Sequence, residues 1–186
     1  MKITVIEKAC KAKREILRLE AVNDEGDWRG TYVGTGGAVF ALDDDFPDLT
    51  PMEYLQVFGV PDKETEKWHI GSGTSTNPVY AGNFPGEIPA FERPLKVANT
   101  VGAWWVFRTQ KGERLFVPAE YLEPFKKLEN VFFFLREHEG IEYLAVKAGF
   151  QLEAVIAVPK EDDPEIKELW RVIRSVFLEE GAEKNE

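Results

Sequence analysis

Four aspartates stand close together in the run ALDDDFPD, and their carboxylates are the side chains best suited to hold a cation. They are Asp43, Asp44, Asp45 and Asp48. Hard cations prefer oxygen ligands, but a calcium loop also needs spaced ligands and a terminal bidentate glutamate, which this run lacks. We therefore expect no metal here. Asp43, Asp44 and Asp45 are instead candidates for a surface that meets a protein partner.

Groups that could act as a general base are few. His69 and His138 are the only histidines, and neither lies in the HxH or HxxxH spacing of a zinc site. The carboxylate pair Glu137 and Glu139 is expected in a turn. Enzyme activity is therefore left uncertain and disfavoured: a small hydrolase with a carboxylate/histidine site is kept as an alternative, and no catalytic residue, metal or cofactor is assigned. The single cysteine, Cys10, excludes an internal disulfide and is expected on the buried side of a helix.

Two glycine-rich stretches, RGTYVGTGG (29–37) and GSGTSTN (71–77), superficially resemble phosphate-binding loops. Such a loop works because its amides end at a helix N-terminus. The first stretch instead leads into a strand, and the second is followed by Pro78 before any helix. Turn and bulge glycines are expected in the first stretch, and a flexible loop in the second.

The first helix, expected near residues 7–14, is locally basic. It carries Lys8, Lys11, Lys13 and Arg14, opposed by Glu7 and Glu15. The whole chain has 33 acidic and 23 basic residues and a net charge of -10, which argues against wrapping nucleic acid but allows phosphate contact along one face. The four basic residues are therefore candidates for DNA contact. An ordinary solvated helix is the alternative interpretation.

Aromatic residues on the expected strands cannot all face one core, because neighbouring residues of a strand point to opposite sides. One of Trp104 and Trp105 must face away from the first core, and so must either Phe133 or both of its neighbours in VFFFLRE. Trp104, Trp105 and Trp170 are kept as candidates for a partner surface. Packing against both faces of the sheet would explain them equally well.

The sequence predicts that a helix followed by three strands with tight turns occurs twice along the chain. The first set has its strands at 16–22, 28–34 and 37–43; the second has its helix near 119–127 and its strands at 131–137, 141–147 and 150–158. Both sets place a Glu-Gly turn between their first two strands, at Glu25-Gly26 and Glu139-Gly140. We expect an α+β fold with repeated units of a helix plus a three-stranded antiparallel meander, and a C-terminal helix.

Local signals predict the remaining elements. KITVI at the N-terminus reads as a strand, Thr50-Pro51 with Glu53 as the capped start of a helix, and 104–109 with 113–118 as a hairpin. Glycines and four prolines make 71–94 a loop or linker. The domain organisation expected is 1–70 for the first unit with its following helix, 71–94 for the linker, and 95–186 for the second unit with the C-terminal helix.

Composition supports a soluble globular protein, with 44% hydrophobic residues in 186. No apolar run approaches the ~20 residues of a membrane helix, and the N-terminus lacks the features of a secretory signal. We expect no membrane association and a cytoplasmic location, which would be the host cytoplasm for a viral protein.

The segment RLFVPAEYLEPFKKLENVFFFLREHEGIEYLAVKAGFQLEAVIAVP (114–159), and more loosely 2–43, resembles the half-domain of the sliding clamps that encircle DNA. The resemblance implies helices that face DNA and a sheet that faces outward. The second helix departs from it, because Glu120 and Glu123 oppose Lys126 and Lys127. The runs GTYVGTGGAVFALD, LQVFGVPDKETEKWHI and LAVKAGFQLEAVIAV also resemble uncharacterised bacteriophage and prophage proteins.

These observations favour a non-catalytic, phage-related accessory protein that contacts replication or host machinery. A protein partner is expected. The most concrete form of the proposed function is clamp-like DNA contact through the first helix. Assembly into a homo-oligomer is left open. The alternative is an acidic DNA mimic that inhibits a host defence protein. The two hypotheses predict opposite results in a DNA-binding measurement, because only the first protein should bind DNA.

Overall fold

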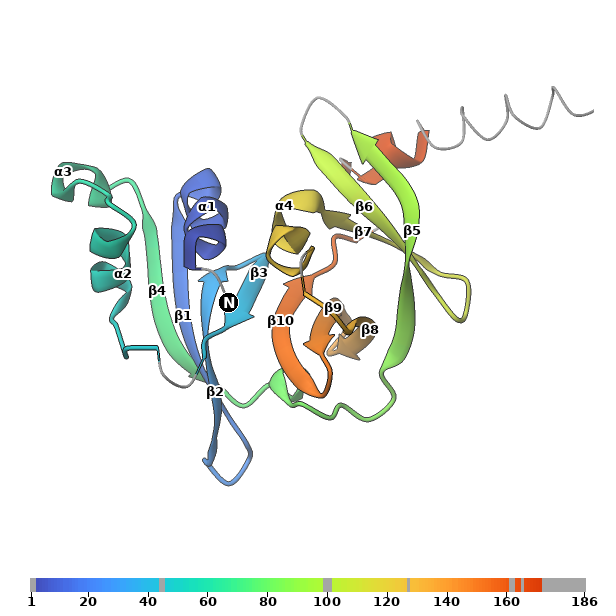
Figure 1. The fold of residues 1–186 in the computed structure, drawn as a ribbon, viewed down its shortest axis with the longest axis horizontal. Helices are drawn as coiled ribbons and strands as arrows, with labels where there is room; N and C mark the ends of the chain where they lie inside the picture. The colour runs from blue at the N-terminus through green and yellow to red at the C-terminus, as the bar shows by residue number, and fades with distance from the viewer. Residues whose placement is uncertain are drawn as a thin grey trace, which may run out of the picture.

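The structure is a computed structural model that describes residues 3–43, 46–98, 102–126, 128–160, 163–164 and 166–171, with backbone alone for 92–96. Figure 1 shows the order of its elements. They are α1 (Ile3–Lys13), β1 (Glu15–Val22), β2 (Trp28–Thr35), β3 (Ala38–Ala41), α2 (Pro51–Val57), α3 (Asp62–Thr65), β4 (His69–Ser75), η1 (Pro78–Tyr80), β5 (Ile88–Ala98), β6 (Ala103–Thr109), β7 (Arg114–Pro118), α4 (Ala119–Leu122), η2 (Glu123–Phe125), β8 (Val131–His138), β9 (Ile141–Ala148) and β10 (Gln151–Ala157).

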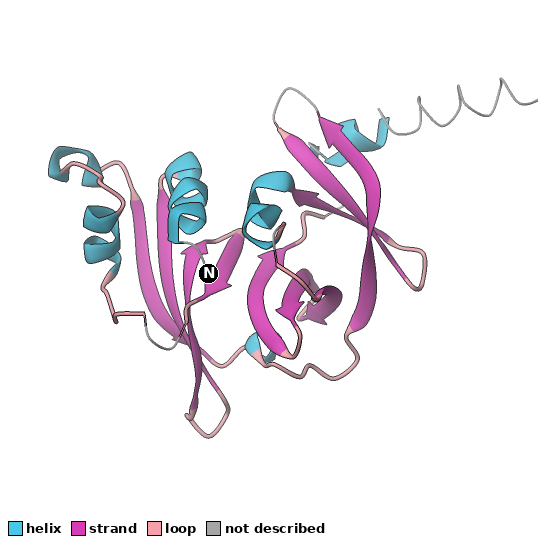
Figure 2. Cartoon of the chain, in the orientation of Figure 1, coloured by secondary structure: helices cyan, strands magenta, loops and turns pink. Residues whose placement is uncertain are grey.

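All these strands form a single sheet in the order β4-β1-β2-β3-β10-β9-β8-β5-β6-β7. The β1–β4 pair is parallel, and the other neighbours are antiparallel. Strands β3 and β10, far apart in sequence, pair through Ala38↔Ile156 to Phe40↔Ala154 and join the two halves of the sheet. The α+β class is thus confirmed, and Figure 2 shows how strongly strands outweigh helices.

Most local predictions are confirmed. The six strands of the two sets lie within two residues of their expected ends, and β6 and β7 form the expected hairpin. Thr50 caps α2 in a complete capping box with Glu53. Pro124 stops α4 at Leu122, after which the chain continues as the 3₁₀ turn η2. Gly34 is required by a close approach, because a Cβ there would lie 2.1 Å from the Ala38 carbonyl oxygen.

The predicted N-terminal strand is wrong, because α1 already begins at Ile3. The β-branched run ITVI has high strand propensity, but tertiary packing overrides it. Ile6, Ala9 and Cys10 share one face of the helix and are buried against the sheet. The structure describes nothing before Ile3.

The prediction of a loop throughout 71–94 is also wrong, since β4 and β5 occupy half of it. Only the crossing segment, residues 76–87, lacks strand structure. Pro89 is tolerated in β5 because it faces Gln110, just beyond the end of β6, and Pro94 lies within the register shift between Glu92 and Lys96. Prolines are accepted at such interruptions of the hydrogen-bonded ladder.

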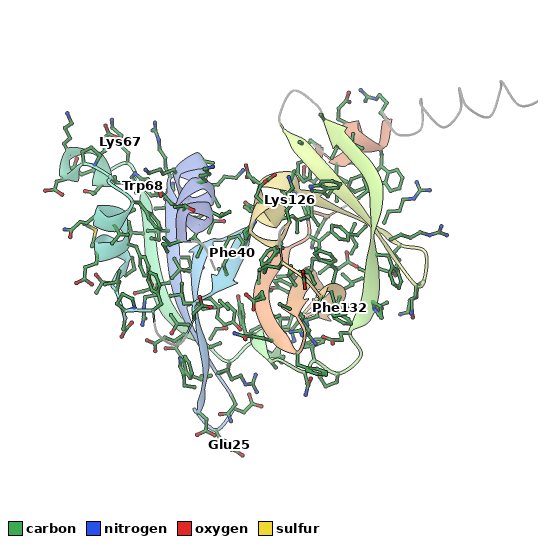
Figure 3. All side chains as sticks on the ribbon, in the orientation of Figure 1. Glu25, Phe40, Lys67, Trp68, Lys126 and Phe132 are labelled. Carbon is green, nitrogen blue, oxygen red and sulfur yellow. The ribbon has the colours of Figure 1, made fainter. Side chains whose placement is uncertain are left out.

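The sheet is covered on both faces. The main core places side chains of α1, α2 and α4 against one face, where Phe40 of β3 lies near the centre of the molecule and its ring is 6.2 Å from that of Phe125 (Figure 3). The opposite face packs against the crossing segment through Val79, Tyr80 and Phe84. The helical residues 166–171 cover the face of β6 and β7 opposite the main core, where Ile166 and Leu169 are buried. The chain beyond 171 lies outside the described residues.

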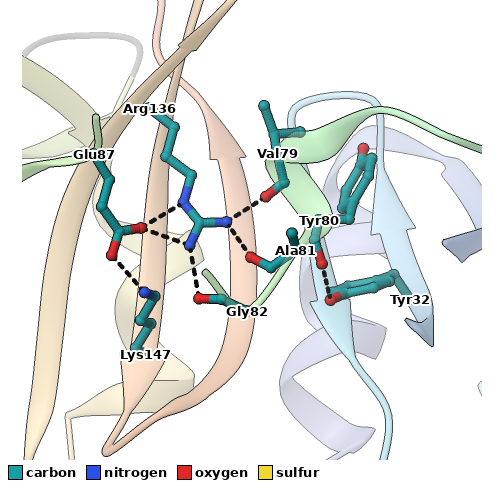
Figure 4. A network of polar contacts seen from close by, with 8 residues as sticks. All are labelled: Tyr32, Val79, Tyr80, Ala81, Gly82, Glu87, Arg136 and Lys147. Carbon is teal, nitrogen blue, oxygen red and sulfur yellow. Dashed lines mark hydrogen bonds and ion pairs between the residues drawn. The ribbon is translucent and has the colours of Figure 1, made fainter. Parts of the chain in front are cut away.

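A buried guanidinium holds the crossing segment in place (Figure 4). The Arg136 side chain is 0% exposed, and all five of its N–H groups donate hydrogen bonds. Its acceptors are the carbonyl oxygens of residues 79, 81 and 82, at 2.6, 2.7 and 3.3 Å, and Glu87 Oε2, at 2.7 and 3.0 Å. Lys147 Nζ donates to the other oxygen of Glu87 at 2.5 Å. Burial lowers the pKa of Arg136, while the bonds to Glu87 favour its charged form.

Replacing Arg136 by Met should lower the free energy of unfolding by about 3–5 kcal/mol, because buried carbonyls and Glu87 lose their partner. Urea unfolding followed by tryptophan fluorescence measures this. Arg171→Met is the matched control, since Arg171 is 78% exposed in its pair with Glu168 and should change stability by less than about 0.5 kcal/mol. Equal effects of the two substitutions would contradict a structural role for the Arg136 network.

Candidate partner-binding groove

Strand β5 leaves β8 soon after the two strands meet. Their pairing covers only Ile88↔Leu135, Pro89↔Phe134 and Ala90↔Phe133, whereas β5 goes on to pair with β6 as far as Ala98. The first residues of β8, Val131 and Phe132, therefore pair with β9 but lie beyond the end of the pairing with β5. This divergence opens the sheet at the start of β8.

Two cavities adjoin at this opening, and together we call them the β5–β8 groove. The first, of about 260 Å³, is lined by Trp105, Leu122, Phe125, Lys126, Leu128, Val131 and Phe133. The second, of about 290 Å³, is lined by Pro89, Ala90, Phe91, Val131, Phe132, Phe133 and Phe134. Val131 and Phe133 line both. Among the residues that the structure describes, Lys126 is the one charged residue in either lining.

Apolar side chains of the groove are unusually exposed. Phe91 is 53%, Phe132 50% and Leu128 44% exposed. Isolated exposed hydrophobic residues need no explanation, but three around adjoining cavities mark a site that can bury apolar surface of a partner. Lys126 lines the first cavity together with Leu128. Its Nζ lies 6.0 Å from the centre of the Trp105 ring and pairs with Glu123.

The three tryptophans proposed from sequence have different positions. Trp105 packs against the main core and lines the groove, whereas Trp104 is buried on the other face with the helical residues 166–171. Trp170 packs edge-on against Phe116, with ring centres 5.2 Å apart, and lies under the guanidinium of Arg114. The expected alternation is therefore confirmed, and it extends to β8, where Phe133 faces the main core and Phe134 the opposite face.

The basic residues proposed for DNA contact all lie on or directly after α1. Lys8, Lys11, Lys13 and Arg14 are exposed. Lys11 Nζ is 2.7 Å from Glu7 Oε1, one helical turn away, and the Arg14 carbonyl oxygen accepts a hydrogen bond from the His69 amide at 2.9 Å. These four side chains can reach a partner without disturbing the core, because the buried side of the helix is formed by other residues, among them Ile6 and Cys10.

Asp43 lines a third cavity, of about 270 Å³, away from the groove. Its other lining residues are Arg18, Glu20, Trp28, Thr31, Leu42, Phe46, Pro47 and Asp48. Arg18 donates to Glu20 at 2.8 Å and also to Asp48. Burial opposes the charge of Arg18, but these bonds outweigh burial and raise its pKa. Asp44 and Asp45 lie outside the described residues.

The groups considered for catalysis or metal binding are spread over the sheet. His69 begins β4 and His138 ends β8, where its Nε2 lies 3.9 Å from an oxygen of the exposed Glu139. Among the described residues, no group of three or more His, Cys, Asp or Glu side chains could hold a metal ion. In the same part of the chain, no helix is long and apolar enough to cross a membrane.

Sequence reasoning missed Phe91, Leu128 and Val131 as site residues. Phe91 fell within the predicted loop, and Leu128 follows a helix with no periodic signal of its own. The register of β5 on β8 brings Phe91 to the residues at the start of β8. Phe132 could have been found, because the alternation in VFFFLRE requires aromatic rings on both faces of the sheet.

Cys10 should be almost unreactive in the folded protein. Burial disfavours its thiolate and raises the pKa from 9.0 to about 12, and Sγ lies 3.3 Å from the Gly34 carbonyl oxygen. At about pH 8 the thiolate fraction falls on the order of a thousandfold, so labelling by a disulfide reagent should be slow until the chain unfolds. Rapid labelling of native protein, at the rate seen in concentrated guanidinium chloride, would show that this side of α1 is open.

Comparisons with known proteins give no template for the groove or for the fold. No family model matches the chain, and neither a curated protein nor a solved structure matches it. We therefore argue function from the residues and geometry described above.

Proposed function

We propose that this protein is a non-catalytic binding protein that captures an apolar segment of a protein partner in the β5–β8 groove. One observation carries the proposal: two cavities lined mostly by hydrophobic side chains adjoin at Val131 and Phe133, with Phe91, Phe132 and Leu128 exposed around them. Burial of apolar surface is the main favourable contribution to most protein association. Contact with phage replication or host machinery is the biological setting in which we place this binding.

The composition of the groove fits recognition better than it fits chemistry. Hydrophobic side chains make up most of both linings and include aromatic rings in each, and Lys126 is held by Glu123 beside Trp105. Aromatic residues bury much surface for little loss of side-chain entropy and are enriched where partners bind tightly. Part of the lining lies on strands of a covered sheet, which reduces the ordering that binding requires.

Selection of a displayed random dodecapeptide library on the immobilised protein tests this function. We expect enriched peptides rich in apolar residues, and the tightest of them should lose about tenfold or more in affinity with Phe132→Asp, because a charge enters the groove. Leu128→Asp should act likewise. Isothermal titration calorimetry measures the affinities.

Trp28→Asp is the matched control, since Trp28 is an aromatic residue with 57% exposure on the other half of the sheet. It should leave the affinity within about twofold of the wild type. Urea unfolding establishes that all three variants are folded. If no peptide is enriched, or if the enriched peptides bind the groove variants as well as the wild type, the proposed function is wrong.

DNA contact through α1 is a second candidate, favoured by the exposure of all four of its basic residues. If the sets α1-β1-β2-β3 and α4-β8-β9-β10 are related units of a clamp-like domain, as the sequence resemblance implies, this surface would face DNA. The pairing of β3 with β10 and the contribution of both helices to one core are compatible with that arrangement.

Lys8→Glu combined with Lys13→Glu should lower the affinity for a duplex of about 30 base pairs by about tenfold or more at about 50 mM salt. The slope of log affinity against log salt should also decrease by about two, because two phosphate contacts are lost. Fluorescence anisotropy measures both. The exposed pair Lys63→Glu with Lys67→Glu carries the same charge change on and after α3 and should have less effect.

Absence of duplex binding by the wild-type protein would contradict the DNA candidate. Salt-sensitive binding to a basic protein would then favour the alternative, in which the acidic chain mimics DNA.

A further inference from the structure

We infer that the partner segment enters the β5–β8 groove as an extended strand that pairs with β8 at Val131. This inference rests on the proposed function of the groove and specifies the conformation and side-chain pattern of the partner.

Backbone hydrogen bonds show toward which neighbouring strand the N–H and C=O groups of each β8 residue point. The Gln110 amide donates to the Pro89 carbonyl oxygen at 3.3 Å, so Pro89 directs its carbonyl away from β8. Because consecutive residues of a strand point their N–H and C=O groups to opposite neighbours, Ala90 directs its groups toward β8. Its partner Phe133 must then direct its groups toward β5.

The same alternation places the backbone groups of Val131 on the side of β8 that β5 occupies farther along. The preceding residue, Asn130, is consistent with this alternation. Its carbonyl oxygen accepts a hydrogen bond from the Gly149 amide at 3.0 Å and so points to the β9 side. Since the pairing between β5 and β8 ends at Ala90↔Phe133, Val131 faces the space from which β5 has diverged. An open strand edge of this kind is a template for another strand.

Side-chain positions also favour a strand over a helix. The first cavity lies on the main-core side with Trp105 and Phe125, whereas Phe134 in the second packs on the opposite face. A strand paired with Val131 points alternate side chains to these two faces. A helix presents its apolar residues along one stripe and, at about 10 Å across, is wider than the ~4.8 Å separation of neighbouring strands.

The partner is therefore a short extended segment with apolar side chains at alternating positions and free amides between them. The tightest peptide from the displayed library is the probe, synthesised with a single N-methyl group at each backbone amide in turn. Methylation removes one donor and keeps every side chain. We expect a loss of about tenfold or more at the one amide that pairs with Val131, and smaller losses at the other positions.

Hydrogen exchange of the Val131 amide supplies an independent readout, because peptide binding should slow it by about tenfold or more. The amide of Glu25, in the distant β1–β2 turn, is the internal control and should not change. A peptide that binds in the groove with no single methylation-sensitive amide, or as a helix by circular dichroism, overturns the strand inference and leaves the proposed function standing. Failure of every peptide to depend on Phe132 and Leu128 overturns both.

Discussion

The ion pair between Arg136 and Glu87 is the interaction on which the arrangement of this sheet depends. Glu87 directly precedes β5, and the first pair of that strand joins Ile88 to Leu135, the neighbour of Arg136. The ion pair therefore fixes the register of β5 on β8. The register in turn determines that the strands separate at Ala90 and Phe133, which is where the groove lies. A shift by one residue would exchange the two faces of β5.

Arg136 is held by its surroundings too completely to act as a ligand-binding group. Its five donors are all used within the chain, and a guanidinium presents no further donor. Its role is to satisfy the carbonyl oxygens of a segment that crosses a sheet face and cannot join the ladder. Such carbonyls would otherwise be buried without partners. A charged group thus stabilises an irregular segment, and that segment covers the second face of the sheet.

Local sequence patterns predicted most of the strands and the β6–β7 hairpin, but not the pairing of strands that lie far apart in the sequence. The capping box at Thr50 and the alternation in VFFFLRE are signals within a few residues, and both are confirmed. Strand β4, rich in glycine and hydroxyl residues, has no such signal, and it is a strand because β1 offers it a parallel edge. The groove needs contacts between residues some 40 positions apart, such as Ala90 and Phe133. No local pattern contains that information.

The two halves of the sheet differ in how fully a helix covers them, and this difference accounts for the groove. Helix α1 runs for 11 residues over the first half, whereas α4 runs for four before Pro124 turns the chain into η2. A longer α4 could have placed further apolar side chains over the start of β8. Instead, Phe125 and Leu128 line a cavity there, and Phe132 keeps half of its surface exposed. A proline that shortens one helix, and a strand that diverges early, together leave apolar surface for a partner to bury.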